Sequence, residues 1–77
     1  MNVRFSKHAV RRISERFSDS VIRLAGIIEE GLQHEWASPL PNSRWCLNGM
    51  IGTRPVRVVI TNEQCGVVTV VTAYWVA

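Results

Sequence analysis

The sequence predicts an α+β domain in which two N-terminal helices pack on an antiparallel sheet of three or four strands. In the first half of the chain, two segments carry apolar residues at helical spacing. In the second half, runs of β-branched residues are separated by residues typical of turns. The 77 residues make a single domain, residues 1–77, and the hydrophobic content of 47% suits a packed core.

The first helix is expected at residues 7–17, after a short edge strand at residues 3–5. Ser6 suits the N-cap, because a serine hydroxyl accepts a hydrogen bond from the free backbone N–H groups of the first turn. One side of this helix is apolar and consists of Ala9, Val10, Ile13 and Phe17. Along the opposite edge runs a row of basic side chains at four-residue spacing, made of His8, Arg12 and Arg16.

A turn at residues 18–20 leads into a second helix, expected at residues 20–32. Its apolar residues recur with the helical period and are Val21, Leu24, Ala25, Ile28 and Leu32. The next segment, residues 34–43, is expected to be a loop, because Pro39 and Pro41 exclude a helix or a central strand.

Three strands are expected at residues 44–50, 55–61 and 66–77, and the last is the most strongly strand-forming run of the chain. A four-residue loop at residues 62–65 would place Thr61 opposite Gly66 and Arg57 opposite Val70. A loop one residue shorter or longer would turn Arg57 to the other side of the sheet.

The four-residue loop puts Arg57 on one face of the sheet together with Thr72 and Tyr74. The opposite face then collects the apolar residues Val56, Val58, Ile60, Val67, Val71, Ala73 and Trp75. We expect the helices to cover one face and to leave the other open. His8 can then approach Tyr74 in two ways: the first helix lies at a sheet edge, or Thr72 and Tyr74 face the helices.

The basic residues are unevenly distributed and are mostly arginine. The net charge is +3, and six of the nine basic residues fall in the first 23 positions. A guanidinium group grips a phosphate with two parallel hydrogen bonds, so the pattern favours a polyanion such as RNA, although an ordinary solvated helix face gives a similar pattern. The residues expected to bind nucleic acid are Lys7, Arg11, Arg16, Arg44 and Arg54.

The order of these residues resembles a small bacterial domain-of-unknown-function family (4258 type). The run SKHAVRRISERF is similar to its His-Ala-x-x-Arg-x-x-x-Arg helix, and the later runs Arg57-Val58-Val59 and Val70 to Trp75 are similar to its last two strands. The likeness spans nearly the whole chain. Phe17 stands where the family usually has glycine, and Ser18-Asp19 replaces its usual Ile-Ser.

That family resembles the barnase, EndoU, colicin and RelE superfamily (BECR fold) of metal-independent ribonucleases, many of which are toxins of toxin–antitoxin systems. The resemblance implies a RelE-like fold, ribonuclease activity and a partner that is an antitoxin or immunity protein. It also selects the candidate site residues His8, Arg12, Arg16, Arg57, Thr72 and Tyr74.

RNA cleavage without a metal needs a base for the ribose 2′-OH, cations for the phosphate and an acid for the leaving oxygen. Histidine titrates near neutral pH, which makes His8 the candidate acid or base. We expect Arg12 and Arg57, with Arg16, to hold the phosphate, and Tyr74 to donate a hydrogen bond or stack on a base. Thr72 would orient His8 or an oxygen. Each of these residues also has an ordinary structural role open to it.

The remaining expectations concern partners and location. Cys46 and Cys65 lack the spacing of a metal site, so we expect free thiols, no metal and no cofactor. The chain has no apolar run of about 20 residues and no signal-peptide pattern, which predicts a cytoplasmic protein without a membrane segment. Two alternatives to a ribonuclease stay open: a non-catalytic nucleic-acid-binding module, and a protein-interaction domain that pairs through a sheet edge, including as a homodimer.

Overall fold

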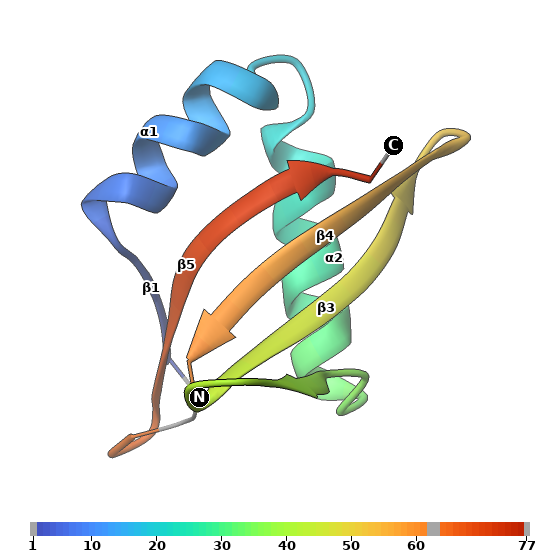
Figure 1. Ribbon diagram of the computed structural model, residues 1–77. Coiled ribbons are helices and arrows are strands. Elements are labelled where there is room, and N and C mark those ends of the chain that lie inside the picture. Colours follow the sequence, from blue (N-terminus) through green and yellow to red (C-terminus); the bar gives the residue numbers. More distant parts are fainter. Residues whose placement is uncertain (1, 62–63, 77) are drawn as a thin grey trace.

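A computed structural model describes residues 2–61 and 64–76 (Figure 1). It has two helices and one five-stranded sheet, so the α+β class is confirmed. In chain order the elements are β1 Asn2–Phe5, α1 Lys7–Arg16, α2 Val21–Gln33, β2 Ser38–Leu40, β3 Arg44–Ile51, β4 Arg54–Thr61 and β5 Val67–Trp75. The strands lie in the order β1-β5-β4-β3-β2.

The prediction of an antiparallel sheet with three or four strands is wrong in two respects. The expected edge strand at residues 3–5 forms as β1 but runs parallel to β5, and β2 is a fifth strand that was not expected. After β1 the chain passes through both helices before it enters the other strands. Because no hairpin joins β1 to β5, these two strands can run in the same direction. β2 forms inside the proline-containing segment, where Pro39 is tolerated because β2 is an edge strand and pairs only with β3.

Both helices form for the reasons that their sequences indicate. The Ser6 hydroxyl accepts a hydrogen bond from the Ala9 backbone N–H at 3.0 Å and so caps α1. The helix ends at Arg16, one residue earlier than expected, and Phe17 becomes its buried C-cap. α2 buries Leu24 and Ile28, as its periodicity predicts.

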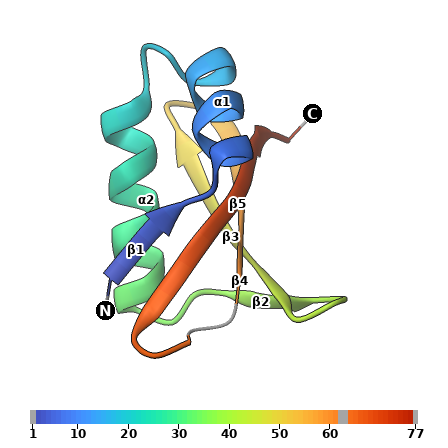
Figure 2. The ribbon, with the colours of Figure 1, turned by 90° about the vertical axis from the view of Figure 1, so that its left-hand side faces the viewer.

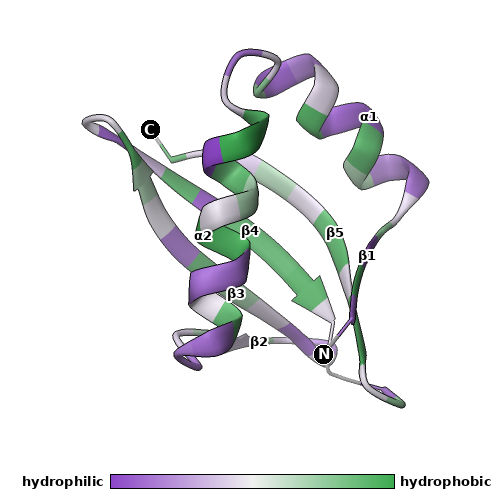
Figure 3. Ribbon diagram, turned by 180° about the vertical axis from the view of Figure 1, so that it is seen from behind, coloured by the Kyte–Doolittle hydropathy of each residue, from purple (hydrophilic) through white to green (hydrophobic). Residues whose placement is uncertain are grey.

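The helices and the sheet form two layers with one core between them (Figure 2). α2 packs across β3, where the absence of a side chain on Gly31 admits Leu47: a Cβ on Gly31 would lie 2.8 Å from the Leu47 Cδ2. Figure 3 looks at the molecule from the α2 side and shows hydrophobic strand segments behind this helix. No described helix covers the opposite face of the sheet, called the open face below.

A β-bulge in β5 decides which side chains reach the core. Ile60 lies opposite Val70 but the preceding Val59 lies opposite Thr72, so Val71 is an extra residue in β5. The side chains that face the core are therefore Val68 and Val70 before the bulge and Ala73 and Trp75 after it. The expected placement of Val67 and Val71 on the core face is wrong, because no bulge was foreseen.

The bulge also corrects the predicted pairing of Arg57, which lies opposite Tyr74 and not opposite Val70. The predicted side of Arg57 is nevertheless confirmed: Arg57, Thr72 and Tyr74 share the open face. The bulge is the reason, because the extra residue turns the later residues of β5 over and so puts Tyr74, and not Ala73, opposite Arg57. Asn62 and Glu63, on which the predicted four-residue loop depended, lie outside the described residues.

Candidate nucleic-acid interface

The open face holds a small polar cluster at the middle of the sheet, formed by Asn48 of β3, Arg57 of β4 and Tyr74 of β5. We call it the Arg57 cluster. The Arg57 Nε donates a hydrogen bond to the Asn48 Oδ1 at 3.1 Å. A side-chain hydrogen bond with Tyr74, followed by the electrostatic interaction with the same residue, raises the pKa of Arg57 above its ordinary value. Arg57 of β4 is therefore linked to one side chain on each of the neighbouring strands β3 and β5.

Thr72 lies two residues before Tyr74 in β5 and on the same face, opposite Val59 of β4. Its side chain is half-buried. The structure thus brings together three of the residues that the sequence singled out, namely Arg57, Thr72 and Tyr74. It adds Asn48, which sequence reasoning missed because only the strand register shows that Asn48 lies opposite Arg57.

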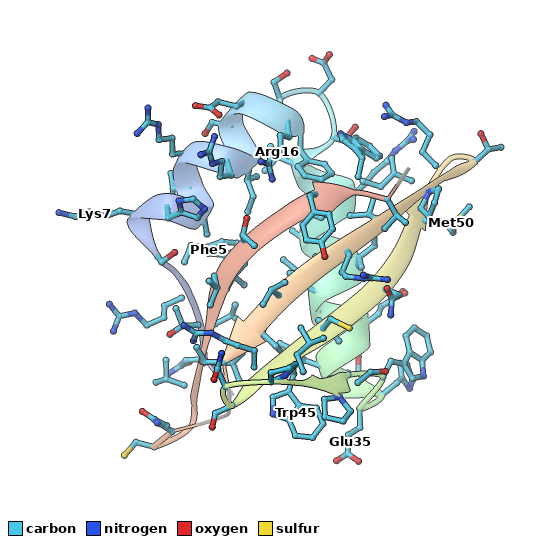
Figure 4. All side chains as sticks on the ribbon, viewed as in Figure 1. Phe5, Lys7, Arg16, Glu35, Trp45 and Met50 are labelled. Carbon is cyan, nitrogen blue, oxygen red and sulfur yellow. The ribbon has the colours of Figure 1, made fainter. Side chains whose placement is uncertain are left out.

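α1 lies along the edge of β5, beyond the end of β1. The Ser6 backbone N–H donates to the Val70 carbonyl at 3.1 Å, and the Ser6 hydroxyl donates to the Val71 carbonyl at 3.4 Å. Further along, the Arg16 Nη1 donates to the Ala73 carbonyl at 3.0 Å, and Figure 4 shows Arg16 between α1 and β5. The helix therefore follows β5 in the same direction and occupies the edge that β1 leaves free.

This arrangement settles how the first helix is placed relative to the open face. The alternative in which Thr72 and Tyr74 face the helices is wrong, and the alternative in which α1 lies at a sheet edge is confirmed. His8 and Arg12 precede Arg16 by two turns and one turn, so all three lie on the flank of α1 that follows β5. Arg12 is bound to the Glu15 Oε2 at 3.2 Å.

His8 is exposed, and within the described residues no hydrogen bond or ion pair joins it to the Arg57 cluster. The carboxylate of Glu15, a possible rival base, is bound by both Arg12 and Arg11. His8 therefore lies on the same flank of α1 as Arg12 and Arg16, and among the described residues no hydrogen bond or ion pair links it to Arg57.

The other basic candidates lie in different places. Lys7 is exposed at the start of α1, and Arg11 forms an ion pair with Glu15 at 3.4 Å. Arg44 is on the open face at the far end of β3, opposite Thr61. Arg54 lies on the helix side of the sheet, with its guanidinium carbon 4.0 Å from the centre of the Trp75 ring, and so does not join the Arg57 cluster.

Basic residues occur in both layers, whereas the described carboxylates are absent from the strands. The five strands contain four arginines, Arg4, Arg44, Arg54 and Arg57, and no carboxylate. All carboxylate side chains of the described residues lie on the helices or on the segments that adjoin them. Arg4, opposite Thr69 in β5, adds another base to the open face. An anion that approaches this face meets no described carboxylate on the strands.

Residues 2–61 and 64–76 contain neither a metal-binding cluster nor a membrane-spanning helix. No three histidine, cysteine, aspartate or glutamate side chains lie close enough together to hold a metal ion. Neither helix is long and apolar enough to cross a membrane. No family model matches the chain, and neither the curated proteins nor the solved structures include one that is significantly similar to it.

Proposed function

We propose that the chain binds single-stranded RNA on the open face of its sheet and cleaves it without a metal, as a ribonuclease of the toxin type. The observation that carries the proposal is the Arg57 cluster, a hydrogen-bonded guanidinium on strands that bear no carboxylate. A phosphodiester needs such a site: a cation whose orientation is set before the ligand arrives.

The cluster leaves donors available for a phosphate. A guanidinium has five N–H groups, and in Arg57 the Nε–H is taken by Asn48 while Tyr74 takes part in another hydrogen bond. The remaining N–H groups can bind two phosphate oxygens. Tyr74 is half-exposed on the same face, which allows its ring to stack on an unpaired base. Arg4 and Arg44 then extend the basic track away from the centre.

The proposed reaction is an internal transfer. A base takes the proton of the ribose 2′-OH, the oxygen attacks the adjacent phosphorus, and the bond from phosphorus to the 5′-oxygen breaks as that oxygen receives a proton from an acid. The products are a 2′,3′-cyclic phosphate and a free 5′-OH. We assign one proton transfer to His8 and charge stabilisation to Arg57 and Arg16. The support for His8 is its position on the flank of α1 that follows β5.

The decisive experiment compares a single-stranded RNA with the DNA strand of the same sequence, both in the presence of a chelator. Cleavage of the RNA alone, with cyclic phosphate ends, is the expected result, because DNA lacks the attacking 2′-OH. His8→Ala and Arg57→Ala should each abolish cleavage, while Arg23→Ala on α2 should leave it unchanged. Growth inhibition in cells that express the wild-type chain, but not His8→Ala, would support the toxin assignment.

A non-catalytic RNA-binding module is the second candidate. It is favoured by one observation: within the described residues the Arg57 cluster is formed, whereas His8 has no bond to it. In that case RNA stays intact, Arg57→Ala loses RNA affinity and His8→Ala does not. Binding without cleavage at high protein concentration would therefore replace the first proposal with this one.

A further inference from the structure

The outer edge of β1 has backbone groups that no described strand uses. The Asn2 N–H donates to the Gly66 carbonyl at 2.8 Å and the Ser6 N–H donates to the Val70 carbonyl at 3.1 Å. Because the backbone of a parallel strand faces its neighbour at every second residue, the N–H and C=O groups of Val3 and Phe5 point the other way. β1 is also the first strand in the sheet order, so nothing in the described sheet covers that side.

An apolar groove of about 630 Å³ lies next to this free edge, between β1 and α2. Val3 and Phe5 enter it from the strand, because they lie opposite Val68 and Val70, whose side chains face the helix layer. Both are well exposed, Val3 at 39% and Phe5 at 42%. The opposite wall comes from α2 and consists of Ala25, Ile28, Glu29, Leu32 and Gln33.

We propose that an extended apolar segment of another protein binds here, as a sixth strand added to β1. A strand placed about 4.8 Å from β1 would pair with the outward backbone groups of Val3 and Phe5. Every second side chain of that strand would then enter the groove against α2. A helix could fill the groove, but it would leave the backbone groups of the strand edge without a protein partner.

The charge in the groove restricts the occupant further. Glu29 is the charged residue of the lining, and within the described residues it forms no ion pair. The occupant should therefore carry a lysine or arginine beside its apolar residues. A second copy that paired through its own β1 would not supply this cation, because Arg4 of β1 lies on the open face. The lining therefore favours a strand from a different protein, one that carries apolar residues and a lysine or arginine beside them.

The test uses a short synthetic peptide in which valines alternate with threonines between terminal lysines. The 15N-labelled chain is titrated with it, and the amide signals of β1 and α2 are followed by NMR. Shifts should concentrate at Val3, Phe5 and the groove side of α2. A peptide with terminal glutamates should bind more weakly, because it would face Glu29.

Two variants separate the backbone from the side-chain contribution. Val3→Pro removes an outward N–H but leaves the β1–β5 ladder intact, and Phe5→Ser removes the largest side chain of the strand wall. Each should weaken peptide binding about tenfold. Ile22→Ser is the matched control, because Ile22 is an apolar residue of α2 that is 89% exposed and outside the groove lining, and it should bind like wild type.

Three results would overturn the proposal. One is unchanged binding by both Val3→Pro and Phe5→Ser, and another is the absence of shifts in β1 at millimolar peptide. The third is a dimer of the chain in sedimentation equilibrium that Phe5→Ser dissociates, since it would show that a second copy occupies the groove. None of these readouts depends on RNA, so they leave the ribonuclease proposal untouched.

Discussion

Trp75 and Arg16 are joined by a hydrogen bond from the indole Nε1 of Trp75 to the backbone carbonyl of Arg16, at 3.0 Å. The Arg16 guanidinium in turn donates to the Ala73 carbonyl, also at 3.0 Å. The Trp75 ring is stacked on Phe17, with ring centroids 4.6 Å apart, and lies under the Arg54 guanidinium. These contacts fasten the end of α1 to the last residues of β5.

Trp75→Phe should therefore destabilise the fold moderately. A phenyl ring keeps much of the stacking on Phe17 but cannot donate to the Arg16 carbonyl, and we expect the free energy of unfolding to fall by about 1–2 kcal/mol. Chemical denaturation followed by circular dichroism measures this difference. Trp36→Phe serves as the control, because Trp36 is 58% exposed, and its stability should stay close to wild type.

Replacing either of two glycines of α2 by alanine should change the stability of the fold, but in opposite directions. A Cβ on Gly31 would lie 2.8 Å from the Leu47 Cδ2, so Gly31→Ala should cost about 1–3 kcal/mol of stability. A Cβ on Gly26 meets nothing within 4 Å, so Gly26→Ala should stabilise the chain by about 0.5–1 kcal/mol through its better helix propensity. Thermal melts of both variants would test these two expectations. Equal changes in melting temperature would contradict the packing of α2 on β3.

The two cysteines should differ sharply in reactivity. Both are free thiols, but Cys65 is exposed and Cys46 is buried in β3. A thiol reagent should therefore modify one cysteine per folded chain rapidly and the second only after denaturation. Cys65→Ser should abolish the fast reaction, whereas Cys46→Ser should not. Rapid modification of both thiols in the folded chain would show that β3 is more open than described.

The sequence predicted the local elements well because their signals are local. The Ser6 cap and the period of Ala9 and Ile13 define α1, and the β-branched runs define β3, β4 and β5. The face of Arg57 could also be predicted, because its neighbours Val56 and Val58 belong on the apolar core face and a charged side chain between them belongs on the opposite face. The parallel pairing of β1 with β5 could not be predicted, because it depends on how α1 and α2 pack and therefore on where β2 begins.

The bulge shows a second limit. Val71 has the same side-chain type as its neighbours, so nothing in the run VVTVV marks it as the extra residue. Asn48 illustrates the consequence for the site: its partnership with Arg57 depends on a register between strands that the turn residues did not fix. The candidate site could thus be predicted as a set of residue types on one face, but not as a set of contacts.

Arg57 should contribute equally to RNA binding at all ordinary pH values. Because Tyr74 raises its pKa above the ordinary value of arginine, the charged form is favoured in the folded chain and would be lost only at more alkaline pH than in a free arginine. We expect the affinity of His8→Ala for single-stranded RNA to be flat between about pH 6 and about pH 9. Fluorescence anisotropy measures this, and a fall in affinity across that interval would point to a different titrating group.

The salt dependence of RNA binding should reveal which arginines contact phosphate. Each phosphate neutralised on a single strand contributes about 0.7 to the slope of log affinity against log salt concentration. Arg57→Ala should therefore lower the slope by about this amount, and Arg54→Ala should leave it unchanged, because Arg54 lies over Trp75 on the helix side of the sheet. Arg57→Lys should restore the slope but not the full affinity, since an ammonium group cannot donate the paired hydrogen bonds of a guanidinium. Equal slopes for the Arg57 and Arg54 alanine variants would place the RNA elsewhere than on the open face.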